Sequence, residues 1–116
     1  MRIHSLPCLL LLGLVLALAQ APAAEPLSGE IRFDRLTVDD GLSSSSVSGI
    51  VQDKAGFIWF ATQSGLNRYD GYNIKRYEND PFNRNSLSHN LIQTMLYEES
   101  GTFWLGTYGG LNRFDP

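Results

Sequence analysis

Few side chains in this sequence have the types and the spacing that chemistry requires. The acidic pairs Asp39-Asp40 and Glu98-Glu99 could supply two carboxylates each. Neighbours on a strand point to opposite faces, however, and residues in turns are solvated, so neither pair suits paired acid-base catalysis. The serine run 43–46 lacks the strand-turn-helix context of a nucleophile elbow. We therefore predict no catalytic residue in this segment.

Histidine and cysteine are also too sparse for a metal or cofactor site. The chain has two histidines and one cysteine, of which His4 and Cys8 lie in the apolar leader. His89, in "SLSHNL", is not followed by the acidic residue that normally follows the phosphoacceptor histidine of a kinase. The sequence therefore predicts no metal, no cofactor and no kinase activity in this segment, and no disulfide after the leader.

The first 23 residues have the three parts of a secretory signal peptide. Arg2 provides the positive start, and an apolar run of twelve residues at 8–19 is followed by small residues and prolines. A spanning helix needs about 20 residues, so export is favoured over an uncleaved anchor. The candidate cleavage sites follow Ala19 and Ala23. We expect an exported, periplasmic protein.

The charge balance argues against nucleic acid as a partner. The chain has 12 acidic and 9 basic residues. Removal of the leader with Arg2 leaves 8 − 12 = −4. A phosphate-binding surface would need a clustered basic excess, which the sequence lacks. We expect instead a small-molecule or oligosaccharide ligand, if the chain has one.

Residues 42–71 and 87–116 are two copies of one repeat. The copies align without gaps at an offset of 45, as from Trp59 to Trp104, and ten of the thirty positions are identical. The positions to which we assign a structural role in the repeat are Gly56, Trp59, Gly65, Leu66, Asn67, Arg68 and Asp70 in the first copy and Gly101, Trp104, Gly110, Leu111, Asn112, Arg113 and Asp115 in the second.

Each copy has the pattern of short antiparallel strands joined by tight turns. In the first copy the strands are expected in "SVSGIVQD", "FIWFAT", "LNRYD" and "YNIKRYEN", with a two-residue hairpin turn at Asp70-Gly71. The second copy repeats the first three. A four-stranded meander of about 45 residues in tandem is typical of β-propeller blades. We predict an all-β fold of propeller blades in an incomplete ring.

The repeat boundaries predict the organisation of the chain. Residues 1–23 form the signal peptide, 24–41 the linker and N-terminal strand, 42–86 the first blade and 87–116 a truncated second blade. The lead-in "IRFDRLTVDDGLS" is similar to "YNIKRYENDPFNRNSLS" before the second copy. Ile31 to Leu36 are therefore expected to form a clasp strand that completes the last blade of a closed ring.

Ligand contacts, if present, are expected in loops at one end of the blades, where the copies differ although their strands agree. Trp59 and Trp104 could stack on sugars, but their identical place in an apolar strand favours a core role. Asn67 and Asn112 could likewise contact a ligand, but more simply satisfy buried polar groups. The candidate ligand-binding residues are Ser44, Ser45, Gln63, Ser64, His89, Asn90 and Tyr108.

The segments "GFIWFATQSGLNRYDG" and "GTFWLGTYGGLNRFDP" resemble the repeats of the two-component regulator propeller family. The lead-in "FDRLTVDDGLSSSSV" resembles the opening of the exported sensor half of hybrid histidine kinases and some diguanylate cyclases. The resemblance implies one or two propeller rings outside the inner membrane, followed by a β-sandwich, a transmembrane helix and a cytoplasmic output enzyme. It also implies a dimeric full-length protein.

Less than two blades cannot close a ring, so we expect the chain to be an N-terminal fragment, a truncated reading frame or a relic, with the remaining blades as its missing partners. The predicted function is the N-terminal part of a ligand-sensing propeller of a two-component signalling protein. The alternatives are the sensor region of a diguanylate cyclase and a freestanding exported propeller that binds or cleaves polysaccharide.

Overall fold

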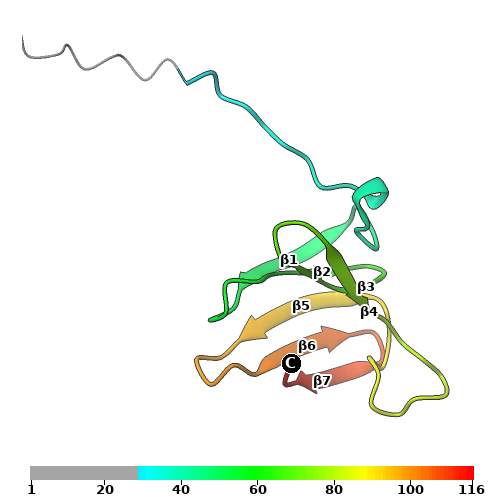
Figure 1. The fold of residues 1–116 in the computed structure, drawn as a ribbon. Helices are drawn as coiled ribbons and strands as arrows, with labels where there is room; N and C mark the ends of the chain where they lie inside the picture. Colours follow the sequence, from blue (N-terminus) through cyan, green and yellow to red (C-terminus); the bar gives the residue numbers. More distant parts are fainter. Residues whose placement is uncertain (1–28) are drawn as a thin grey trace, which may run out of the picture. The chain divides into compact units, whose positions relative to one another are not determined.

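A computed structural model describes residues 29–116, and the predicted signal peptide lies outside the described residues. The all-β prediction is confirmed, with two antiparallel sheets that follow one another along the chain (Figure 1). A short 3₁₀ helix precedes them. The elements are η2 (Val38–Asp40), β1 (Val47–Gln52), β2 (Ile58–Thr62), β3 (Gly65–Tyr69), β4 (Ile74–Tyr77), β5 (Ile92–Tyr97), β6 (Phe103–Thr107) and β7 (Gly110–Phe114).

The first sheet has the order β1-β2-β3-β4 and the second the order β5-β6-β7, as the meander pattern predicts. Trp59 and Trp104 occupy the same register position, opposite Arg68 and Arg113 respectively. The first strand of each sheet carries a bulge at the same place in the repeat, after Val47 and after Ile92. Repetition of the sequence therefore reproduces the strand pairing in detail.

The β3–β4 hairpin turn lies one residue further along the chain than expected. The ladder ends at the pair Tyr69 and Ile74, and the Asp70 N–H donates to the Asn73 carbonyl at 3.3 Å. The central residues are therefore Gly71, with φ of +100°, and Tyr72. The Asp70 carboxylate accepts the N–H groups of Tyr72 and Asn73 at 2.8 and 2.7 Å. This Asx-type capping makes Asp70 the residue before the two central residues of the turn, although it was predicted to be one of them.

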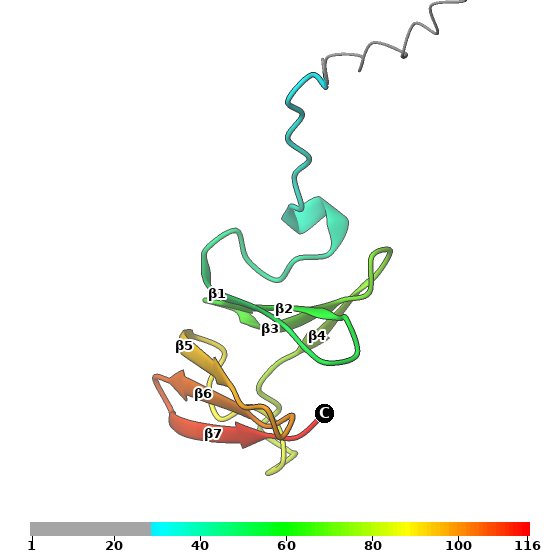
Figure 2. The same ribbon diagram turned by 90° about the vertical axis from the view of Figure 1, so that its left-hand side faces the viewer.

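The two sheets pack face to face and form one hydrophobic core (Figure 2). Trp59 is completely buried and its ring lies 4.9 Å from Phe103 and 5.5 Å from Phe114, centroid to centroid. On the first sheet, Ala61 and Leu66 are buried beside it. The bulged Ser48 also links the sheets, because its hydroxyl donates to the Ile92 carbonyl at 2.7 Å.

Residues 31–36, the predicted clasp, contain no strand, and Ile31 and Phe33 are 84% and 86% exposed. The blade that a clasp would complete is not among the described residues, so the clasp stays a prediction. After it, Thr37 caps the 3₁₀ helix and its N–H donates to the Asp40 carboxylate at 2.7 Å. Asp40 thus has a local structural role.

Replacement of Gly65 by alanine should destabilise the fold more than the same change at Gly110. Both glycines have positive φ, +126° and +110°, so alanine is strained at either position by about 1–3 kcal/mol. A β-carbon on Gly65 would in addition lie 2.8 Å from the Tyr77 carbonyl oxygen, whereas nothing lies within 4 Å at Gly110. The free energy of unfolding, measured by urea titration, should fall further for Gly65→Ala. Equal losses would contradict the close approach to β4.

Candidate ligand-binding face

The loops proposed to carry a ligand site lie at one end of each sheet. In the first sheet, the Gln63 N–H donates to the Ser46 carbonyl at 3.2 Å, which joins the β2–β3 turn to the lead-in of β1. In the second sheet, the Tyr108 N–H donates to the Leu91 carbonyl at 3.2 Å. The variable loops of each repeat are thus brought together by main-chain hydrogen bonds.

Beneath each pair of loops lies the same network of three polar side chains. In the first repeat, Asn67 accepts the Ser43 N–H at 2.9 Å and donates to the Ser43 hydroxyl at 2.7 Å. That hydroxyl lies 2.8 Å from the Thr62 hydroxyl, which donates to the Gly65 carbonyl at 2.9 Å. The second repeat forms the network again, with Ser88, Thr107 and Asn112 in place of Ser43, Thr62 and Asn67.

This network assigns a structural role to residues that could also have been ligand contacts. Asn67 is completely buried and satisfies the backbone of the loop. The sequence reasoning did not single out Thr62 and Thr107, although their identity in both copies was a signal that could have found them. The network fixes the base of each loop, while the variable residues lie above it.

The candidate residues of the first repeat form a small polar surface. Ser45 and Gln63 are exposed, and Ser44 and Ser64 are half-buried. The Ser44 hydroxyl accepts the Ser46 N–H at 3.1 Å, and the Ser64 N–H donates to the Thr62 hydroxyl at 3.0 Å. The Gln63 side chain and the Ser45 hydroxyl have the exposure that a ligand contact requires.

The candidate residues of the second repeat differ in their availability. His89 and Tyr108 are exposed, and their rings meet edge to face at 6.0 Å. Asn90 instead accepts the Asn79 N–H at 2.6 Å. Its side chain therefore stabilises the connection between the two sheets, residues 78–91, which we call the crossover. The structure therefore brings His89 and Tyr108 together as one aromatic surface and gives Asn90 a structural task.

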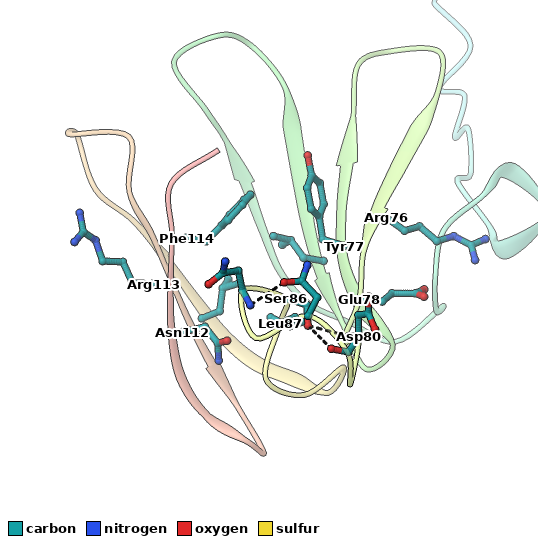
Figure 3. A pocket seen from close by; sticks show the side chains of 13 residues that line it. Arg76, Tyr77, Glu78, Asp80, Ser86, Leu87, Asn112, Arg113 and Phe114 are labelled. Atoms are coloured by element: carbon teal, nitrogen blue, oxygen red, sulfur yellow. Dashed lines mark hydrogen bonds between the residues drawn. The ribbon is translucent and has the colours of Figure 1, made fainter.

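A hollow with polar groups lies elsewhere, and none of the candidate ligand-binding residues lines it (Figure 3). It has a volume of about 330 Å³ and lies between β4 and β7. Leu66, Tyr77, Leu105 and Phe114 supply its apolar surface. Strand β7 pairs only with β6 among the described strands, whereas the equivalent strand β3 also pairs with β4. The pocket therefore opens along the sheet edge that a fourth strand covers in the first repeat.

The two tryptophans, predicted to be equivalent, have different surroundings. Trp59 is buried, and its indole N–H donates to the Asp53 carboxylate at 2.8 Å. Asp53 also accepts the Phe57 N–H at 3.0 Å, so it organises the β1–β2 turn. Trp104 is half-buried on the outer face of the second sheet. Trp59 is therefore a core residue, as predicted for both tryptophans. Trp104 is only partly buried, because no sheet covers it among the described residues.

The remaining polar repeat residues lie at the opposite end of the strands from the loops. The guanidinium of Arg68 lies 4.6 Å from the centre of the Phe57 ring, and Arg113 forms an exposed ion pair with Asp115 at 3.2 Å. The backbone N–H groups of Asn73 and Tyr72 lower the pKa of the Asp70 carboxyl below its ordinary value. These contacts stabilise turns and do not form a reactive site.

The described part of the chain contains no group of three or more potential metal ligands. Between residues 29 and 116 there is also no helix of the length and apolarity that a membrane crossing requires.

Residues 41–64 match the family model described as two component regulator propeller. The chain is 48% identical over 56 residues to histidine kinase P4 of Formosa agariphila. That alignment covers 48% of this chain and 4% of the kinase. The resemblance drawn from the repeat motifs is confirmed.

Solved structures agree with this assignment. The extracellular domain of a hybrid two component system of B. thetaiotaomicron aligns with a TM-score of 0.66 and 34% identity, over 71% of this chain and 12% of that one. A second such domain from the same organism aligns with a TM-score of 0.54 and 27% identity, over 59% of this chain and 9% of that one. The chain therefore resembles a small part of the extracellular domains of hybrid two-component systems.

Proposed function

We propose that this chain is the N-terminal part of an exported, ligand-sensing β-propeller that belongs to a bacterial two-component signalling protein. The observation that carries the proposal is the 34% identity, over 71% of the chain, to the extracellular domain of a hybrid two component system. The chain spans only 12% of that domain and 4% of the related histidine kinase. In this proposal, kinase activity resides in another part of the signalling protein.

The loop face is the part of the described chain best suited to sensing. Its base is the repeated Asn-Ser-Thr network, and its exposed residues change between repeats, from Gln63 to Tyr108 and from Ser44 to His89. Variation on a constant scaffold is the usual arrangement of a recognition surface. We infer that a small molecule or oligosaccharide binds there and shifts the balance between two states of the sensor.

The genomic context gives the first test of this proposal. Translation of the locus through and beyond the codon for Pro116 should give further 45-residue repeats, a membrane-spanning helix and a histidine kinase domain. A frame that continues into a hydrolase without a membrane span would favour the exported polysaccharide-active propeller instead. A diguanylate cyclase domain after the membrane-spanning helix would support a sensor whose output enzyme is a cyclase and not a histidine kinase.

A loop variant tests ligand sensing itself. In the complete signalling protein, Gln63→Ala with Tyr108→Ala should lower the response of a transcriptional reporter to an inducing oligosaccharide, found in a panel of defined oligosaccharides, at least tenfold. Phe82→Ala, at a 99% exposed position of the crossover, is the matched control and should leave the response unchanged. An unchanged response in the double variant would refute the loop face as the ligand site.

A further inference from the structure

His89 holds the loop that leads into β5 through a hydrogen bond to the backbone two residues later. The Leu91 N–H donates to His89 Nδ1 at 3.0 Å. In the first repeat, the Ser44 hydroxyl accepts the Ser46 N–H at 3.1 Å in the same way. Ser44 and His89 are counterparts, 45 residues apart. The two repeats therefore cap the same backbone group, one with a hydroxyl and the other with an imidazole, and only an imidazole gains a proton near neutral pH.

The hydrogen bond from Leu91 determines which imidazole nitrogen carries the proton. A neutral imidazole has one nitrogen that accepts and one that donates, whereas a protonated imidazole has two donors. Because Nδ1 accepts the Leu91 N–H, the proton of neutral His89 lies on Nε2. Protonation of Nδ1 would place one N–H against another. The bond can therefore exist only while His89 is neutral.

Leu91 joins His89 to the β6–β7 turn. Its N–H is held by His89, and its carbonyl accepts the Tyr108 N–H at 3.2 Å. A β-carbon on Gly109 would lie 2.9 Å from the His89 β-carbon, so the turn lies directly against His89. Residues 88–91 and 108–109, which we call the second-repeat loops, thus form one packed unit. A change at the imidazole should reach both segments.

The imidazole is accessible to protons from the solvent. His89 is exposed, and no ion pair between the described residues includes it. The Tyr108 phenol is the titratable group that faces it, with the ring centroids 6.0 Å apart, and a phenol carries no charge between pH 5 and 8. The flanking Asn90 side chain is an uncharged amide, which accepts the Asn79 N–H. The hydrogen bond with Leu91 is therefore the contact that protonation changes.

We propose that protonation of His89 releases the second-repeat loops and makes ligand binding at the loop face depend on pH. The loop release stands by itself, whereas its effect on binding rests on the proposed function. At low pH the Leu91 N–H loses its acceptor, and the His89 and Tyr108 rings lose the support that keeps them together. The first repeat, which Ser44 caps, should keep its geometry at either pH. Binding should therefore be tighter at about pH 7.5 than at about pH 5.5.

Amide exchange with water, measured by nuclear magnetic resonance on the full chain, tests the release without any ligand. Each rate is divided by the intrinsic rate at the same pH. Between about pH 7.5 and 5.5, the protection of the Tyr108 N–H should fall at least threefold, which is the scale of one lost hydrogen bond. The Gln63 N–H, which bonds to the Ser46 carbonyl in the first repeat, is the internal control and should keep its protection. Equal changes at Tyr108 and Gln63, or no change at Tyr108, would overturn the proposal.

Replacement of His89 by serine places the capping residue of the first repeat in the second. In His89→Ser, the protection of the Tyr108 N–H should be the same at both pH values. Nitrogen-15 spectra of the wild-type imidazole should show a proton on Nε2 and none on Nδ1 at about pH 7.5, as the bond from Leu91 requires. A loss of protection at low pH that persists in His89→Ser, or a proton on Nδ1 at about pH 7.5, would contradict the role of His89.

The complete signalling protein tests the consequence for the ligand site. With the inducing oligosaccharide of the reporter assay, the half-maximal concentration should be at least threefold higher at about pH 5.5 than at about pH 7.5. In His89→Ser it should not depend on pH, so this variant also controls for pH effects in other parts of the protein. The same pH dependence in both proteins would refute regulation of the site by His89. If no oligosaccharide induces a response, the proposed function fails, while the exchange measurement still decides the loop release.

Discussion

Replacement of Trp59 by alanine should remove about 3–5 kcal/mol from the free energy of unfolding, the range for a large aromatic side chain lost from a packed core. Trp59 is completely buried, it contacts Phe103, Phe114 and Tyr77, and its indole N–H is bonded to Asp53. Small domains have about 5–15 kcal/mol of stability in total, so the loss should be a large fraction of it. Urea titration followed by far-ultraviolet circular dichroism measures the loss without dependence on tryptophan fluorescence.

The repeat supplies a matched control for this experiment. Trp104→Ala makes the same chemical change at the same register position, opposite Arg113 instead of Arg68. Trp104 is half-buried, so the alanine variant loses less buried apolar surface and leaves a smaller cavity. The free energy of unfolding should therefore fall by less than about 2 kcal/mol. Both variants are compared at a concentration at which the chain is monomeric. Equal losses of unfolding free energy in the two variants would show that burial against the second sheet is not the source of the stability that Trp59 contributes.

Asn67→Ala should give the second largest loss of stability. The change removes the acceptor of the Ser43 N–H and the donor to the Ser43 hydroxyl, next to a completely buried site. A buried polar group left without a partner costs about 1–3 kcal/mol, and the Ser43 N–H becomes such a group in this variant, whereas the Ser43 hydroxyl keeps its bond to the Thr62 hydroxyl. Thermal unfolding and urea titration should both show the loss. Amide hydrogen exchange at Ser43 should rise as well, since the loop loses its anchor.

Asn112→Ala is the control for this second experiment. Asn112 makes the same two bonds to Ser88, at 3.0 and 2.6 Å, but it is half-buried. Water can replace the lost partners there, so the cost should be about 1 kcal/mol or less. If Asn112→Ala lowered the free energy of unfolding as much as Asn67→Ala, the stability contribution of the network would depend on its hydrogen-bond geometry and not on its burial.

The strands and most turns of this protein follow from local sequence. Runs such as "FIWFAT" combine aromatic and β-branched residues between glycine-containing turns, and the structure has β2 at Ile58–Thr62. The predicted position of the Asp70-Gly71 turn was wrong by one residue. Asp70 precedes the two central residues of the turn, because its carboxylate accepts hydrogen bonds from the backbone N–H groups of Tyr72 and Asn73. Local hydrogen bonding of that kind has no signature in hydrophobic pattern.

The candidate ligand site was only partly predictable. The loops that differ between repeats do lie at one end of each sheet, which the order of strands and turns already required. Asn90 was included among the candidates, yet its side chain holds the crossover through Asn79, eleven positions earlier. A contact between two loop residues depends on the path of the crossover, and that path is not encoded by strand periodicity.

The sequence by itself determined the repeat, the strands, their antiparallel order and the family that the repeat resembles, since these depend on local residue types and on a 45-residue spacing. Tertiary structure decided which member of each repeated pair is buried. Trp59 and Trp104, or Leu66 and Leu111, are identical in sequence but differ in exposure. Burial is a property of a residue and its neighbour together, and within residues 29–116 only the first sheet has a neighbour on that face.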